Sequence, residues 1–199
     1  MRSTMKTIFA AAGILWSALF VQSSTAADAN ERPVKDLSRA SSEIHWPKGF
    51  NPKEADAFSH NEIWIDAPAS VIWANLVDAK SWPAWYSNAS DIQIGNSDKN
   101  ALEAETTFTW RTFGFPVQSK VSEFVPDQRI GWFGSATGIT AYHTWLIVTK
   151  AGGCEVITEE SQVGAAAIRY NIEQPTAMHD GHNWWLNALK YRSEHSPSK

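Results

Sequence analysis

The chain has 199 residues, with 17 basic and 21 acidic side chains and a formal net charge of −4. It contains no run of basic residues, so neither nucleic acids nor anionic membrane surfaces are expected as partners. The length suffices for one domain with a sizeable hydrophobic core. A single cysteine, Cys154, excludes an internal disulfide, and we expect it to be an inert packing residue.

The first 26 residues have the order of a secretory signal peptide. Arg2 and Lys6 precede an uncharged apolar run over 7–21, and small residues follow it. The run is shorter than the roughly 20 residues that a membrane-spanning helix needs. We therefore predict cleavage after Ala26 or Ala27 and export to the periplasm or the medium, with no stable membrane insertion of the mature protein.

Residues 27–59 are polar, contain prolines and show no sustained hydrophobic period. We expect them to form an N-terminal arm, ordered in part around Ile44, Trp46 and Phe50. One domain is expected to follow over 60–195.

The hydrophobic pattern becomes regular after residue 60. NEIWID (61–66) alternates apolar and polar residues, which predicts a strand. Pro68 then precedes apolar residues at helical spacing, which predicts a helix up to residue 78. SWPAWYSN (81–88) follows, and its Pro83 permits only one more short helical turn.

Six further strands are predicted between this turn and residue 164, over 90–95, 104–113, 115–126, 129–136, 139–150 and 153–164. Residues 176–194 carry apolar side chains at steps of three and four, which predicts a long C-terminal helix. Strands joined by short links form an antiparallel sheet, and this helix is the only sizeable element that could cover its apolar face.

The last two strands can be paired from the sequence. A tight turn at Gly152 and Gly153 would place His143 opposite Glu160, with Trp145 on the same side of the sheet. Neither side of this hairpin is cleanly apolar. We assign the Trp145 side to the interior, because it places one large aromatic ring among smaller groups.

Residues 63–94 resemble the opening of START-like (SRPBCC, helix-grip) domains, in the branch labelled polyketide cyclase/dehydrase and lipid transport. The positions that carry the resemblance are Ala67, Pro68, Val71, Trp73, Leu76, Asp78, Trp82, Pro83 and Trp85. GGCEVITEESQVG (152–164) and WLNALKYRSE (185–194) resemble the late strand and the end of the C-terminal helix of such domains.

The resemblance implies an α+β helix-grip fold, in which a curved antiparallel sheet of about seven strands wraps around the C-terminal helix. It also implies a deep cavity for a hydrophobic molecule such as a lipid, a sterol-like compound or a polyketide. Some such domains are aromatase/cyclases and many only hold a ligand, so the fold does not decide the function.

The chain has eleven tryptophans, more than a core of this size requires. We expect a set of large side chains to line the ligand cavity: Trp82, Trp85, Phe108, Trp110, Trp132, Trp145, Met178, Trp185 and Leu189. His182 lies on the same helical stripe as Met178 and Trp185 and would supply a polar contact.

His143 and Glu160 are the candidate catalytic residues. A carboxylate beside an imidazole in a cavity could act as an acid/base pair in a cyclase or dehydratase. It could also orient a bound ligand, or be an ordinary cross-strand ion pair at the rim. A third interpretation of the chain is an interaction module whose cavity is filled by its own tryptophans.

Metal and cofactor sites are not expected. His179 and His182 lie three residues apart, but this helix offers no evident third ligand. No nucleophile elbow, phosphate-binding loop or dinucleotide fingerprint is present. The leading hypothesis is an exported protein that binds a hydrophobic small molecule, and the alternative is a cyclase/dehydratase-type enzyme. The ligand and the oligomeric state cannot be inferred from the sequence.

Overall fold

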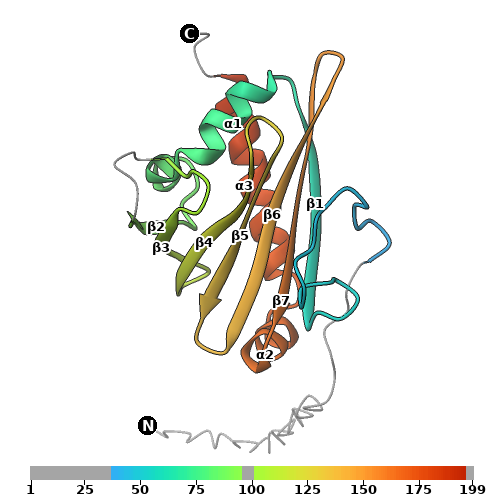
Figure 1. The fold of residues 1–199 in the computed structure, drawn as a ribbon, viewed down its shortest axis with the longest axis vertical. Helices are drawn as coiled ribbons and strands as arrows, with labels where there is room; N and C mark the ends of the chain where they lie inside the picture. The colour runs from blue at the N-terminus through green and yellow to red at the C-terminus, as the bar shows by residue number, and fades with distance from the viewer. Residues whose placement is uncertain (1–36, 96–100, 196–199) are drawn as a thin grey trace, which may run out of the picture. The chain divides into compact units, whose positions relative to one another are not determined.

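The computed structural model describes residues 37–95 and 101–195 and contains a seven-stranded sheet. Each strand pairs antiparallel with its neighbours, in the order β1-β7-β6-β5-β4-β3-β2 (Figure 1). The strands are β1 (Ala57–Ile65), β2 (Ser90–Ile94), β3 (Thr107–Thr112), β4 (Phe115–Val125), β5 (Arg129–Ala136), β6 (Ile139–Lys150) and β7 (Gly153–Val163). The predicted antiparallel sheet is confirmed.

Helices α1 (Ala69–Val77) and α3 (Ala177–Glu194) match the two predicted helices. The short helix η1 (Ala79–Ala84) contains Pro83, as expected for one further turn after α1. Figure 1 shows α3 running along one face of the sheet, which confirms the predicted helix-grip fold. Within the described residues, no helix is both long and apolar enough to cross a membrane.

Helix α2 (Ala165–Glu173) was not predicted. It follows directly after β7, where Gly164 adopts a φ of 125° that lets the chain turn out of the sheet. The segment is nine residues long, and only Ala167 and Asn171 are buried. Nine residues between the end of a strand and the proline before α3 offer few helical turns over which a period can be recognised, so the sequence analysis missed this helix.

The register between β6 and β7 is the one predicted. His143 lies opposite Glu160, and Trp145 lies opposite Thr158. Trp145 is fully buried in the main core, so the side assigned to the interior is also correct.

The opposite side of the same hairpin is buried as well, because the N-terminal arm covers it. Ile44 packs against Leu146 and Ile157, and Trp46 joins this second cluster. The ring of Phe50 packs at tilted angles against Phe133 and Tyr142 in the same layer. Both sides of the hairpin are buried, and each carries apolar side chains together with buried polar ones. For this reason neither side stands out from the sequence as the apolar one.

Glu159, whose side chain points under the arm, is held by two short hydrogen bonds. Its Oε1 accepts from the main-chain N–H of Ser41 at 2.6 Å and lies 2.6 Å from Nδ1 of His60. β1 begins at Ala57, inside the segment predicted to be an arm. The sequence pattern missed this start because His60 and its neighbours are buried polar residues, which give no alternation of apolar and polar side chains.

Candidate ligand-binding site

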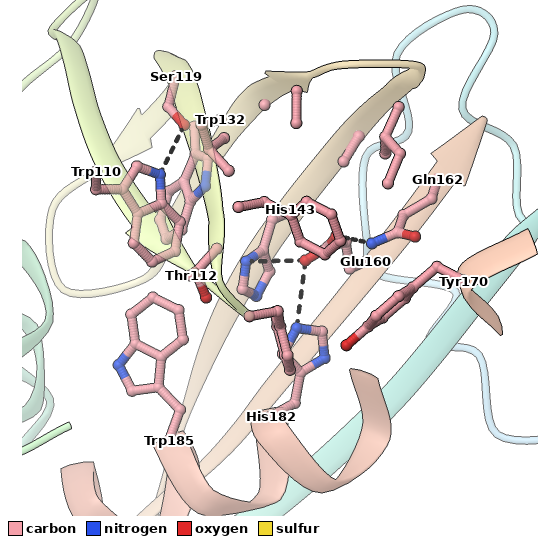
Figure 2. Close-up of a pocket in the computed structure, with 17 residues that line it drawn as sticks. Trp110, Thr112, Ser119, Trp132, His143, Glu160, Gln162, Tyr170, His182 and Trp185 are labelled. Atoms are coloured by element: carbon pink, nitrogen blue, oxygen red, sulfur yellow. Dashed lines mark hydrogen bonds and ion pairs between the residues drawn. The ribbon is translucent and has the colours of Figure 1, made fainter. Parts of the chain in front are cut away.

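A cavity lies between the sheet and α3, at the end of the sheet where the β3–β4 and β5–β6 turns meet α2 (Figure 2). The space open to the centre of a water molecule is about 70 Å³, and the empty space between the lining side chains, mouth included, is about 670 Å³. The lining residues are Trp110, Thr112, Phe113, Phe115, Val117, Ser119, Trp132, Gly134, Ala136, Ile139, Ala141, His143, Glu160, Gln162, Tyr170, His182 and Trp185.

Three ionisable side chains meet at one wall of this cavity. Oε2 of Glu160 lies 3.3 Å from Nδ1 of His143 and 3.3 Å from Nε2 of His182. Figure 2 shows the carboxylate between the two imidazole rings. Their side chains are between 1% and 12% exposed, so the cluster is almost completely withdrawn from bulk solvent.

Three elements position this cluster. β6 and β7 place His143 and Glu160 opposite each other on the concave face of the sheet, and α3 brings His182 over them. Gly181 allows α3 to come this close to the β3–β4 turn, since a Cβ there would lie 2.3 Å from the ring of Phe113. The glycine in HDGH therefore serves packing rather than flexibility.

A chain of hydrogen bonds fixes the hydrogen on one nitrogen of His143. The hydroxyl of Thr158 donates to the main-chain carbonyl of Thr144 at 3.1 Å. It must therefore accept from Nε2–H of His143, which lies 2.8 Å away. A neutral His143 then has an unprotonated Nδ1 facing the carboxylate of Glu160, and we assign this tautomer from the network.

The charges of the cluster follow from burial and contacts. Burial and the neighbouring His182 lower the pKa of His143 to about 3, against a smaller opposing effect of Glu160. Burial raises the pKa of Glu160, but the hydrogen bond from His182 and the interaction with His143 together lower it to about 2. The cavity therefore presents a neutral His143 beside an ionised Glu160 at neutral pH.

Six of the side chains named from the sequence meet at this cavity: Trp110, Trp132, His143, Glu160, His182 and Trp185. The other six lie elsewhere: Trp82, Trp85, Phe108, Trp145, Met178 and Leu189. Most of these are buried in the core; Trp85 is half-buried at its edge. Their roles as ligand contacts stay predictions, but in this conformation they do not line the cavity.

The sequence reasoning missed the side chains that close the cavity. Phe113 and Phe115 flank the β3–β4 turn, and Tyr170 comes from α2. The signal for the first two was their position, because two aromatic residues flank Gly114, whose φ of 76° marks the turn. Tyr170 could not be found without α2.

The two tryptophans of SWPAWYSN differ in position: Trp82 lies in the core and Trp85 at its edge. Trp82 is fully buried, and its indole N–H donates to the carbonyl of Leu76 at 3.0 Å. Its ring packs edge-on against Trp110 and Trp185, at centroid distances of 5.5 and 4.9 Å. Trp85 instead donates to the hydroxyl of Ser81 and lies under the guanidinium of Arg192, away from the cavity.

The histidine next to the cluster, His179, is exposed and lies within 3.0 Å of the amide of Asn61. It belongs to the same helix as His182 but not to the cavity. His179 and His182, which the sequence analysis considered together as possible metal ligands, therefore lie in different surroundings.

The family model of the polyketide cyclase / dehydrase and lipid transport family matches residues 59–178. The chain belongs to this family. The match spans β1 to the start of α3 and includes His143 and Glu160. None of the curated proteins compared with the chain matches it significantly.

Solved structures show the same fold. A hypothetical protein of Helicobacter pylori is 33% identical with a TM-score of 0.71, over 77% of this chain and 98% of its own. The Zhui aromatase/cyclase of Streptomyces sp. R1128 is 13% identical with a TM-score of 0.58, over 69% and 93%. Norcoclaurine synthase of Thalictrum flavum, in complex with dopamine and hydroxybenzaldehyde, is 16% identical with a TM-score of 0.55, over 71% and 88%.

Substituting each tryptophan of SWPAWYSN in turn compares the contribution of a buried ring to stability with that of a ring near the surface. We expect Trp82→Ala to lower the free energy of unfolding by about 3–5 kcal/mol, since it removes a fully buried ring. Trp85→Ala should cost only about 1 kcal/mol, because the ring is half-exposed and makes one side-chain hydrogen bond. Urea unfolding followed by circular dichroism measures both. Equal losses would show that Trp82 is not the centre of this core.

Proposed function

We propose that this protein binds a small, mostly aromatic or apolar molecule whose hydrogen-bonding group is oriented by His143, Glu160 and His182. The observation that carries this proposal is the composition of the cavity. Its walls are built mainly from tryptophan, phenylalanine and aliphatic side chains, and its polar cluster is concentrated at one place. Such walls with few convergent polar groups are typical of small-molecule sites.

The volume of the cavity limits the ligand. At about 10–15 Å³ for each water centre, 70 Å³ holds about five to seven waters. One or two fused rings, partly in the mouth, fit this space better than a sterol or a long acyl chain. The rings of Trp82, Trp145 and Phe108 occupy the neighbouring interior that a larger ligand would need.

The polar cluster favours a ligand that donates hydrogen bonds. Nδ1 of His143 is an acceptor, and Oε2 of Glu160 can accept a further hydrogen bond besides the one from Nε2–H of His182 at 3.3 Å. Oε1 of Glu160 accepts from the amide of Gln162 at 2.6 Å. A hydroxyl or a protonated amine on the ligand would satisfy these acceptors. A ligand carboxylate would be repelled by Glu160.

A cyclase/dehydratase-type enzyme is the second candidate, supported by the contact between His143 and Glu160. A general base works best when its pKa is near the working pH. The pKa values of about 3 for His143 and about 2 for Glu160 are far below neutrality, which makes either group a weak base. The cluster is better suited to orient a ligand than to remove a proton from it.

We also propose that the protein acts outside the cytoplasm. The support is the signal-peptide pattern of residues 1–26, which lie outside the described residues. The intact mass of the protein recovered from the periplasm or medium should lack 26 or 27 N-terminal residues. Recovery of the full-length chain in the cytoplasmic fraction alone would contradict export.

The ligand proposal is tested with 2-naphthol and naphthalene, which differ by one hydroxyl. We expect the protein to bind 2-naphthol at least about tenfold more tightly, because a hydrogen bond to a charged group contributes about 1.5–3 kcal/mol. Glu160→Gln should remove most of this difference and leave naphthalene binding unchanged. Quenching of tryptophan fluorescence measures both affinities.

Two phenylalanine substitutions on β6 serve as a matched pair. Ala141→Phe places a ring in the cavity and should abolish binding of both probes, whereas Thr140→Phe adds the same ring on an exposed position. Unchanged binding to Ala141→Phe, or equal affinity of the wild type for the two probes, would contradict the proposed site.

A further inference from the structure

We propose that His143, Glu160 and His182 form a binding site for one divalent transition-metal ion of the Zn²⁺ type, with an open coordination position toward the cavity. This assignment goes beyond the binding of an organic ligand and does not depend on it. It also departs from the sequence expectation that no metal site is present, since the third ligand comes from β7 and not from the helix that carries His179 and His182.

The donor set suits such an ion. Two imidazoles and one carboxylate are a ligand combination that Zn²⁺ and Fe²⁺ use when one or more positions stay open for water or substrate. Among the described residues, these three side chains are the group whose ligand atoms all lie within 4.8 Å of one another. They come from three different elements, so the fold rather than a local motif assembles them.

The distances also fit. Ligand atoms about 2.0–2.1 Å from a tetrahedral metal ion lie roughly 3.3–3.4 Å apart. Oε2 of Glu160 is 3.3 Å from Nδ1 of His143 and 3.3 Å from Nε2 of His182. Two edges of the tetrahedron are thus already present, and the two histidine ligand atoms that form the third edge lie within 4.8 Å of each other.

The hydrogen-bond network prepares His143 for this role. Because Nε2–H donates to Thr158, the Nδ1 lone pair points at an acceptor, the carboxylate of Glu160. Two acceptors at this distance repel each other, and a cation between them would replace the repulsion with two bonds. In metal sites a ligating histidine typically donates its other N–H to an outer residue, and a ligating carboxylate is itself hydrogen-bonded; here His143 donates to Thr158, and Gln162 donates to Glu160.

His182 can present Nε2 to a metal ion because its other ring nitrogen, Nδ1, can carry the hydrogen of the neutral ring. Its ring is 1% exposed, and within the described part of the chain its Nδ1 has no hydrogen-bond partner. Nε2–H of His182 donates to Glu160. A metal ion would take the place of this hydrogen, and the unpartnered Nδ1 could carry the proton of the neutral ring instead, so that Nε2 would bind the metal. Since all three side chains line the cavity, a fourth ligand would come from water or from the oxygen of a bound molecule.

The test is a titration of tag-free protein with Co²⁺ alone, followed by visible absorption and by calorimetry. We expect one equivalent to bind with the intense absorption of a four- or five-coordinate ion. Glu160→Gln and His182→Gln should each weaken binding by at least about tenfold. The matched controls Glu155→Gln, on the same strand, and His179→Gln, on the same helix, should bind like the wild type.

Zn²⁺ provides a second readout that does not depend on the variants. At one hundred times its dissociation constant, Zn²⁺ should raise the Tm of the wild type by about 5–10 °C. Circular dichroism confirms that each variant is folded before its affinity is compared. Absence of stoichiometric Co²⁺ binding to the wild type, or equal affinities in wild type and Glu160→Gln, would overturn the metal site and leave the naphthol test unaffected.

Discussion

The antiparallel pairing of β6 with β7 is the interaction on which the site depends. This register puts His143 opposite Glu160 and points both into the interior. Because side chains alternate between the two faces of a sheet, a slip of one residue would exchange the cavity cluster for the residues under the arm. Hydrophobic side chains hold the register from both sides, with Trp145 and Val156 in the main core and Leu146 and Ile157 under Ile44.

The arm therefore packs as part of the binding domain. It lies on the face of the sheet opposite the cavity, where its contacts with Leu146 and Ile157 bury apolar surface that would otherwise be exposed. The network of Ser41, His60 and Glu159 adds directional hydrogen bonds to the same layer. The hairpin that carries the cluster is clamped between two cores, which keeps its polar side chains in fixed positions.

The tryptophans divide between two tasks. Trp82 and Trp145 fill the interior, whereas Trp110, Trp132 and Trp185 each have one side toward the core and another toward the cavity. This division makes the cavity small and gives it rigid walls, since packed aromatic rings have little freedom to move. The family shares its fold across different activities, and in this chain the aromatic packing restricts the size of what can bind.

The strands, the two main helices and the β6–β7 register could be predicted, because hydrophobic period and turn residues act locally. The pairing of His143 with Glu160 followed from the turn at Gly152 and Gly153. The choice between core and cavity could not be predicted, since Trp82 and Trp110 are equally apolar in sequence and differ only in what packs beside them. The helical stripe placed His182 at the cavity, but its contact with Glu160 depends on where α3 lies on the sheet, which no local pattern encodes.

A neutral His143 beside an ionised Glu160 is the central feature of this cavity, and nitrogen-15 NMR of the histidine rings tests it directly. Desolvation lowers the pKa of His143 to about 3, so the ring should stay neutral throughout the range from pH 8 to pH 5. We expect its hydrogen on Nε2 and none on Nδ1 over this whole range. An imidazolium that forms as the pH falls through 6–7 would contradict this description of the cavity.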